Sequence, residues 1–106
     1  MLEFQAFISP ASPSVQTLGL FQQISSLSTV RALDVPVFGA TSKAPNYAIV
    51  QAETQNVRYR DDGLPPTAAV GLLLIAGDPP TKFTGNLGLL KFIEATASAK
   101  LNVRYY

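Results

Sequence analysis

The sequence predicts a mainly β protein: a single-domain antiparallel β-sandwich, jelly-roll-like, with an extended N-terminal arm. Apolar and polar residues alternate over many short segments, and turns rich in Pro and Gly separate these segments. The word Asn-Val-Arg-Tyr occurs at residues 56–59 and again at 102–105, and its period of two is typical of a strand with one buried face. At 106 residues and 47% hydrophobic content, the chain is long enough for one packed core.

The N-terminal residues divide into an apolar and a proline-containing part. Residues 2–8 alternate as an extended segment, and Pro10 and Pro13 then break the pattern. The segment is either the first strand of the domain's own sheet or an arm that pairs with a neighbouring subunit. We divide the chain into an arm over residues 1–13 and a β-sandwich domain over 14–106. The candidate inter-subunit anchors of the arm are Leu2, Phe4 and Phe7.

The next stretch gives the weakest pattern. Apolar residues at 18, 21, 24 and 27 fit one face of a short helix, although Gly19 and many Ser and Thr residues oppose a helix. The valines of residues 30–37 favour a strand instead, and Pro36 places that strand at an edge or a bend.

Two hairpins are predicted in the second half. Residues 47–52 and 56–60 alternate and are joined by a possible turn at 53–55, with Asp61-Asp62-Gly63 as turn residues after the second strand. Residues 89–95 and 99–106 form the second predicted hairpin. Between them, the apolar run 68–76 is either a strand buried on both faces or a strand broken at Gly71.

A second word, Gly-x-Pro-Pro-Thr, occurs at residues 63–67 and 77–81. Paired prolines cannot donate backbone hydrogen bonds and hold the chain near the polyproline conformation, so both copies are stiff loops. We expect the two loops at the same end of the molecule. Their candidate partner contacts are Pro65, Pro66, Pro79 and Pro80.

Low charge is the main compositional signal. Only 14% of residues are charged, against about a quarter in typical globular domains. We therefore expect neighbours to cover part of the surface; the alternative is a surface made polar by Ser, Thr, Asn and Gln. A net charge of +1 with scattered basic residues argues against a nucleic-acid partner. The run 68–76 is about half the length of a bilayer span, so no membrane partner is expected.

The inventory of reactive side chains argues against an enzyme. The sequence contains no Cys and no His, which excludes thiol nucleophiles, disulfides and histidine bases from this chain. Asp61 and Asp62, with Glu53 or Asp78, are a possible site for a hard cation, although Asp-Asp-Gly is more typical of a turn. We expect no catalytic residues, no cofactor and no metal.

Arginines and tyrosines offer one possible binding surface. Arg58, Arg60 and Arg104 lie close in sequence to tyrosines at 59, 105 and 106, and such groups can stack on sugars or on single-stranded nucleic acid. The favoured interpretation is a solvated strand face with cross-strand ion pairs. Arg58 and Arg60 nevertheless remain candidate partner contacts.

Residues 49–106 resemble a group of small proteins of tailed bacteriophages. The resemblance lies in an Arg-x-Arg-Asp-Asp-Gly turn at 58–63, a following Pro-Thr and apolar Val-Gly segment, and a Phe-Ile-Glu-Ala segment that leads to an aromatic C-terminal pair. Leu64 departs from this group, in which a smaller polar residue often follows the glycine. These motifs are structural and not catalytic.

The resemblance implies a non-enzymatic virion structural protein. Its expected function is that of a capsid decoration or cement protein, which stabilises the head by bridging subunits of the major capsid protein. Such proteins are often homotrimers, made in the bacterial cytoplasm and located on the capsid surface. The alternative is a tail or fibre component that acts as a carbohydrate- or receptor-binding module.

Overall fold

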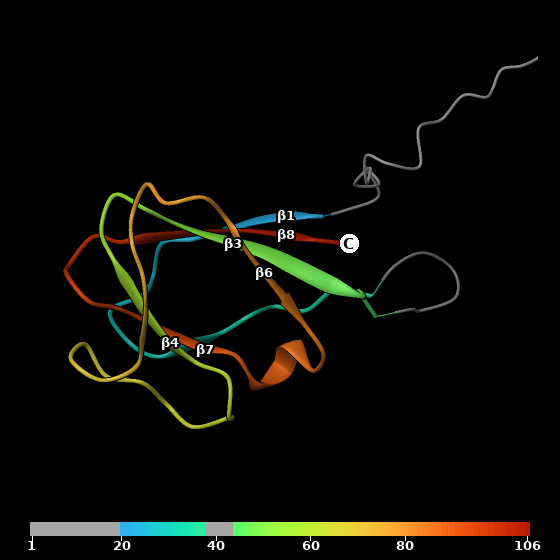
Figure 1. The fold of residues 1–106 in the computed structure, drawn as a ribbon, viewed down its shortest axis with the longest axis horizontal. Helices are drawn as coiled ribbons and strands as arrows, with labels where there is room; N and C mark the ends of the chain where they lie inside the picture. The colour runs from blue at the N-terminus through green and yellow to red at the C-terminus, as the bar shows by residue number, and fades with distance from the viewer. Residues whose placement is uncertain (1–19, 38–43) are drawn as a thin grey trace, which may run out of the picture.

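Two four-stranded antiparallel sheets face one another in the computed structural model, which describes residues 20–37 and 44–106 (Figure 1). Sheet A has the order β1-β8-β3-β6, and sheet B has the order β2-β7-β4-β5. The elements are β1 (Phe21–Ile24), β2 (Arg31–Ala32), β3 (Tyr47–Glu53), β4 (Val57–Arg60), β5 (Leu72–Leu74), β6 (Thr81–Thr84), the 3₁₀ turn η2 (Leu87–Leu89), β7 (Lys91–Glu94) and β8 (Lys100–Tyr105).

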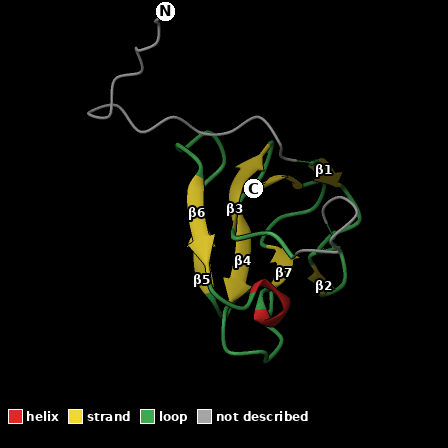
Figure 2. Cartoon of the chain, turned by 90° about the vertical axis from the view of Figure 1, so that its right-hand side faces the viewer, coloured by secondary structure: helices red, strands yellow, loops and turns green. Residues whose placement is uncertain are grey.

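The strand order defines two open sides of the sandwich. Strands β1 and β2 are outer strands on one side, and β6 and β5 are outer strands on the other, as Figure 2 shows. The predicted mainly β, antiparallel two-sheet fold is confirmed. The predicted arm, with Leu2, Phe4 and Phe7, lies outside the described residues.

The core lies between the sheets and is built by the predicted alternation. In β3 and β8 every second side chain is buried, and in β4 Val57 is fully buried while Tyr59 packs against the core. The described residues bury no polar or charged residue in this core. The buried set is Ile24, Leu27, Leu33, Ala48, Val50, Ala52, Val57, Leu74, Leu87, Leu90, Phe92, Ala99, Leu101, Val103 and Tyr105.

Both predicted hairpins are wrong, because the two connections cross from one sheet to the other. Strand β3 pairs with β8 and β6, not with β4, and β7 pairs with β4 and β2, not with β8. The two Asn-Val-Arg-Tyr words therefore lie in opposite sheets, with Val57 and Val103 both facing the core. An alternating pattern sets which side chains point inward, but it does not set which strand lies alongside.

The β3–β4 and β7–β8 connections share one backbone feature. Thr54 and Ser98 have φ values of 75° and 73°. These values lie in the left-handed region, which residues other than glycine seldom adopt. One connection lies against the other: the Ala95 N–H donates to the Asn56 carbonyl at 2.9 Å, and the Asn102 side chain donates to the Glu53 carboxylate at 2.7 Å. These contacts, with burial of the flanking strands, hold both bends in place.

The helix favoured by the spacing of residues 18–27 does not form in its described part. Residues 21–24 are strand β1, which pairs with β8 so that Ile24 lies opposite Leu101. Ile24 and Leu27 are buried while Phe21 is 62% exposed, so the evenly spaced apolar residues do not form one buried helix face. The valine-rich stretch of residues 30–37 forms only the two-residue outer strand β2. The 3₁₀ turn η2 was not predicted from the sequence.

The apolar run 68–76 is not a doubly buried strand. Only Leu72–Leu74 form β5, Gly71 precedes the strand with a φ of 142°, and only Leu74 of the run is buried. The expectation that both Pro-Pro loops lie at one end is also wrong. A single strand, β5, separates them, so residues 63–67 and 77–81 lie at opposite ends of it.

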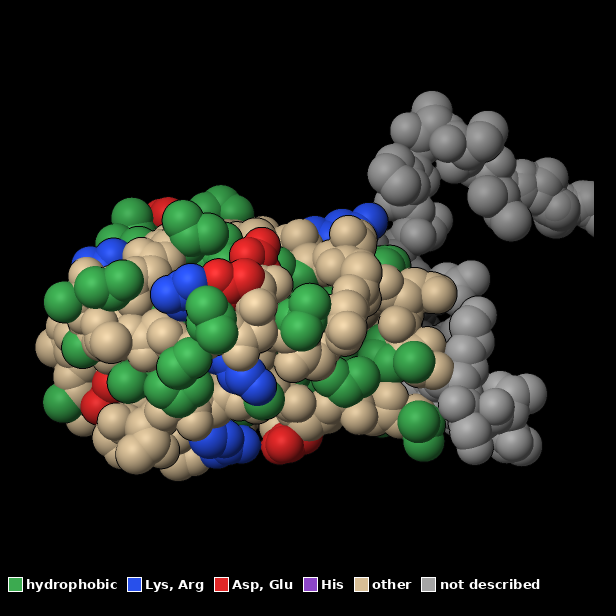
Figure 3. Space-filling model, turned by 90° about the horizontal axis from the view of Figure 1, so that it is seen from below, with side chains coloured by type: hydrophobic (Ala, Val, Ile, Leu, Met, Phe, Trp, Pro, Cys, Tyr) green, Lys and Arg blue, Asp and Glu red, His purple; other side chains and the backbone are tan. Residues whose placement is uncertain are grey.

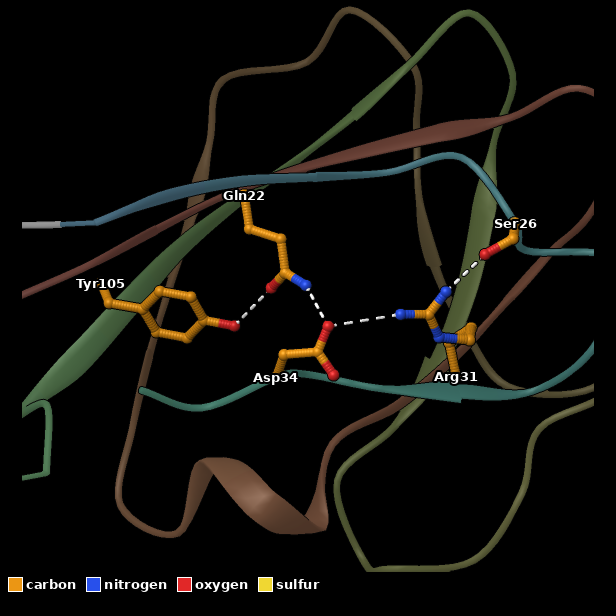
Figure 4. A network of polar contacts seen from close by, with 5 residues as sticks. All are labelled: Gln22, Ser26, Arg31, Asp34 and Tyr105. Atoms are coloured by element: carbon orange, nitrogen blue, oxygen red, sulfur yellow. Dashed lines mark hydrogen bonds and ion pairs between the residues drawn. The ribbon is translucent and has the colours of Figure 1, made fainter. Parts of the chain in front are cut away.

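A polar network closes the side of the sandwich formed by β1 and β2 (Figure 4). The Tyr105 hydroxyl, on sheet A, donates to the Gln22 side-chain oxygen at 2.8 Å, and the Gln22 amide donates to the Asp34 carboxylate. Asp34 also contacts Arg31 at 3.5 Å, and Arg31 in turn donates to Ser26. Since Arg31 belongs to sheet B, the network joins the two sheets.

Burial, and then the negative charge of Asp34, raise the pKa of Tyr105 to about 12. A tyrosine in the unfolded chain ionises near pH 10, so between about pH 10 and 12 the unfolded state has lost a proton that the folded state retains. The contribution of Tyr105 to the free energy of unfolding is therefore fully present below about pH 10. Above about pH 10 it falls, by at most about 1.4 kcal/mol per pH unit.

Replacing Tyr105 with Phe is expected to reduce the fall in the free energy of unfolding above about pH 10. At neutral pH the variant should lose about 1 kcal/mol, because the hydrogen bond to Gln22 disappears. Burial also raises the pKa of Tyr59, so some alkaline loss should remain. Urea unfolding of both proteins at pH 8, 10 and 11 measures the difference, and identical slopes would contradict the assignment to Tyr105.

Candidate functional site

Exposed apolar side chains gather around β5. Figure 3 views the molecule from the side of sheet B, where hydrophobic side chains (green) lie between scattered charged ones. Six apolar residues on β5, on its flanking loops and on η2 are 40–57% exposed, and we call them the β5 patch. Its members are Leu64, Val70, Leu72, Leu73, Ile75 and Leu89.

Hydrogen bonds hold the loop that precedes β5. Arg58 donates from Nη1 to the Gly71 carbonyl at 3.0 Å and from Nε to the Ala68 carbonyl at 3.3 Å. Thr67 and Val70 exchange two backbone hydrogen bonds, of 2.9 and 3.2 Å. Arg58 therefore holds the loop before β5 through its hydrogen bonds, and its predicted role as a partner contact stays a prediction.

Strand β5 has three residues and is the most apolar of the outer strands in the described structure. Natural sheets guard free edges with short strands, Lys, Pro or bulges. Strand β6 carries Lys82 and follows two prolines, β2 has only two residues and includes Arg31, and β1 contains two glutamines. The sequence of β5 is Leu-Leu-Leu, so its free edge combines unpaired backbone with apolar side chains.

A hollow lies beside β5, between the two sheets. Gly77 donates its N–H to the Ala52 carbonyl at 3.3 Å, and the Gln51 side chain donates to the Asp78 carbonyl at 3.1 Å, which fixes the loop at its mouth. The hollow has a mixed lining from β3, β5 and the loop before β6. Val50, Ala52, Leu73, Leu74, Ile75 and Pro79 are its apolar residues, and Gln51, Asp78 and Thr81 are its polar residues. The hollow and the β5 patch form one continuous surface, since Leu73 and Ile75 belong to both.

A second surface, which we call the tyrosine face, lies on the outer side of sheet A. Tyr47 and Tyr106 stack with ring centroids 5.1 Å apart. The Lys82 ammonium lies 4.3 Å from the Tyr47 ring centre, and the Arg104 guanidinium lies 5.6 Å from that of Tyr106. In the described structure the buried Arg104 Nε has no hydrogen-bond partner.

The predicted arginine–tyrosine surface is not assembled as expected. Tyr59 and Tyr105 point into the core, so only Arg104 and Tyr106 of the proposed set lie together. Arg60 instead pairs with Asp62 through contacts of 2.5 and 3.1 Å. The sequence interpretation missed Tyr47 and Lys82, whose position follows only from knowing that β3 lies between β8 and β6.

The prolines divide into exposed and buried residues. Pro65, Pro79 and Pro80 are exposed, and Pro79 borders the hollow. Pro66 is buried within the domain.

Asp61 and Asp62 belong to a turn. Arg60 lowers the pKa of Asp62 by hydrogen bonding, and the same carboxylate accepts the Leu64 N–H at 3.1 Å. Within residues 20–37 and 44–106, no three acidic side chains come together as a metal site. These carboxylates are therefore assigned to the Asp-Asp-Gly turn.

Fold and surfaces together define a mainly β, two-sheet protein with an apolar patch around β5 and a tyrosine face on sheet A. No family model, no curated protein and no solved structure matches the chain. Among the residues that the structure describes, no helix has the length and apolar character needed to cross a membrane.

Proposed function

We propose that this chain is a non-enzymatic virion structural protein of a tailed bacteriophage. It decorates or cements the capsid by bridging subunits of the major capsid protein. It is made in the bacterial cytoplasm and acts on the capsid surface as an oligomer, a homotrimer in the preferred form. The observation that carries the proposal is the β5 patch, an apolar surface around an unguarded strand edge, which a neighbouring subunit would cover.

Burial of the patch would supply the attachment energy. Removing apolar surface from water contributes about 25 cal/mol per Å², or about 1.5–3 kcal/mol for one leucine that becomes fully buried. Each contact is modest, but an oligomer engages several sites at once, and the linked contacts reinforce one another. The low charge of the chain, 14% of residues, supports a surface meant to be covered.

The strand order supports a jelly-roll assignment. Strand β1 pairs with β8, and among the described strands every connection except β4–β5 crosses between the sheets. Double-sheet jelly rolls of eight strands occur among viral capsid domains and lectins. This support is an analogy of fold, so it favours the class of protein and not a particular partner.

The test is reattachment of purified protein to particles of the source phage. Leu72, 57% exposed in the β5 patch, is replaced with Gln, and Phe21, 62% exposed on the opposite side, is replaced with Gln as a matched control. L72Q is expected to weaken binding about 10- to 100-fold, the equivalent of one lost leucine burial, while F21Q changes it little.

Quantitative mass spectrometry of the intact particle gives the copy number in parallel. Hundreds of copies are expected for a capsid protein. A handful of copies, or wild-type binding by L72Q, would overturn the cement function.

The second candidate function is a carbohydrate- or receptor-binding module of a tail or fibre. The tyrosine face favours it, because rings and cations lie beside a row of amide side chains on Gln23, Asn102 and Gln51. Amides and guanidinium groups hydrogen-bond to hydroxyls, and aromatic rings pack against the apolar faces of sugars. A glycan array would show binding that Tyr106→Ala removes, and signals at background would eliminate this function.

A further inference from the structure

We propose that residues 2–8 of one copy bind as an added strand along the free edge of β5 in a neighbouring copy. This inference rests on the proposed role as an oligomeric structural protein, and it names the partner of the β5 patch. The occupant is a segment of a second copy of this chain.

The free edge of β5 has the properties that strand addition requires. Strand β5 pairs with β4 on one side only, with Leu73 opposite Arg58 and Leu72 opposite Tyr59. Its other edge has no strand partner among the described residues. An added strand would complete the backbone hydrogen bonds and place its alternate side chains against apolar groups on both faces of the sheet.

The proposed occupant matches this edge in pattern. Residues 2–8 read Leu-Glu-Phe-Gln-Ala-Phe-Ile and carry a single charge, at Glu3. Phe4 and Phe7 have opposite parity, so an extended segment directs them to opposite faces. One aromatic ring would then lie against the hollow beside β5, and the other against the opposite face of the sheet.

The point where the segment leaves the domain favours a neighbouring copy. The chain enters the sandwich at β1, which lies on the side opposite to β5 (Figure 2). The residues between 8 and 20, if extended, span roughly 40 Å, which is enough to cross to an adjacent subunit. Strand β1, from which the arm extends in sequence, and the free edge of β5 lie on opposite sides of each copy, so the proposed contact is head-to-tail and can close a ring such as a trimer.

Disulfide trapping tests the contact directly, because the chain contains no native cysteine. Full-length Phe7→Cys and Leu73→Cys variants are prepared singly, mixed in equal amounts and oxidised with a glutathione buffer. A disulfide-linked heterodimer is expected as the main product on a non-reducing gel. The control pairs Phe7→Cys with Gln23→Cys, an exposed residue on sheet A far from β5, and is expected to give at most a tenth as much product.

The double variant F7C/L73C distinguishes the remaining arrangements. A ladder of covalent oligomers is expected. Closure of the disulfide within a single chain would mean that the segment binds its own β5 and would overturn the inference. Efficient dimerisation of L73C alone would mean that two β5 edges pair with each other, which would reject the contact between residues 2–8 and β5. The absence of any cross-link above the control would reject the same contact. Circular dichroism of each variant confirms that the strands are retained.

Failure of this inference and failure of the proposed function give different results. Wild-type attachment to particles without the Phe7–Leu73 cross-link would preserve the cement function and reject strand addition. Efficient cross-linking of a protein absent from the particle would preserve strand addition and reject the cement function.

Discussion

Replacing Phe92 with alanine is expected to lower the free energy of unfolding by about 3–5 kcal/mol. Phe92 is fully buried at the centre of β7, and its ring lies 6.1 Å from Tyr59 and 6.5 Å from Phe83. Truncation removes a large apolar side chain and leaves a cavity between the sheets, which the paired strands cannot close. A domain of this size is stable by about 5–15 kcal/mol, so the loss takes a large part of the total.

Urea unfolding measures this effect against a matched control in the same strand. Ile93 follows Phe92 and points to the outer face of sheet B, where it is only partly buried. Ile93→Ala is expected to cost less than half as much as Phe92→Ala, because it opens no cavity. Equal losses would contradict the placement of Phe92 at the centre of the core.

The inward-facing side chains of the sheets could be predicted from the sequence. Alternation alone places Ala48, Val50 and Ala52 on one side of β3, and Val103 and Tyr105 on one side of β8, and the structure buries all five. The pattern suffices because burying one face of a strand is a local requirement that every second residue must meet.

Strand pairing could not be predicted in the same way. A short connection between two alternating segments is compatible with a hairpin and equally compatible with a crossing from one sheet to the other. The decisive features are the left-handed Thr54 and Ser98, and neither is a glycine or asparagine that would have marked the bend. Without the pairing, the sequence cannot show that Tyr47 and Tyr106 stack or that Lys82 approaches them.

The exposure of the β5 patch could not be predicted from its apolar composition. A continuous apolar run is typical of a strand buried on both faces, yet Leu72, Leu73 and Ile75 remain exposed because β5 is an outer strand. Of the predicted partner contacts, Arg58 donates hydrogen bonds to the loop before β5, and Pro66 is buried beside Gly71. The sequence could not separate the exposed residues of this region from those that are buried or hydrogen-bonded within the domain.

Replacing Gly71 with alanine is expected to destabilise the protein by about 1–3 kcal/mol and to loosen β5. Gly71 has a φ of 142°, and an added Cβ would lie 3.1 Å from Pro66 Cβ and 3.1 Å from the Tyr59 carbonyl oxygen. A proline ring and a strand backbone cannot swing aside. The loop must therefore shift, which strains the hydrogen bond from Arg58 to the Gly71 carbonyl.

Gly77→Ala is the matched control at the other end of β5. Gly77 also has a positive φ, of 88°, but nothing lies within 4 Å of the added Cβ. We expect urea unfolding to show a loss about 1 kcal/mol larger for Gly71→Ala, and hydrogen exchange to show faster exchange at Leu72–Leu74 in that variant alone. Equal losses would mean that backbone conformation, and not the approach to Pro66 and Tyr59, limits this position. If attachment to particles falls with the loosening of β5 while the rest of the sandwich keeps its protection, the rigidity of this edge is itself required for binding.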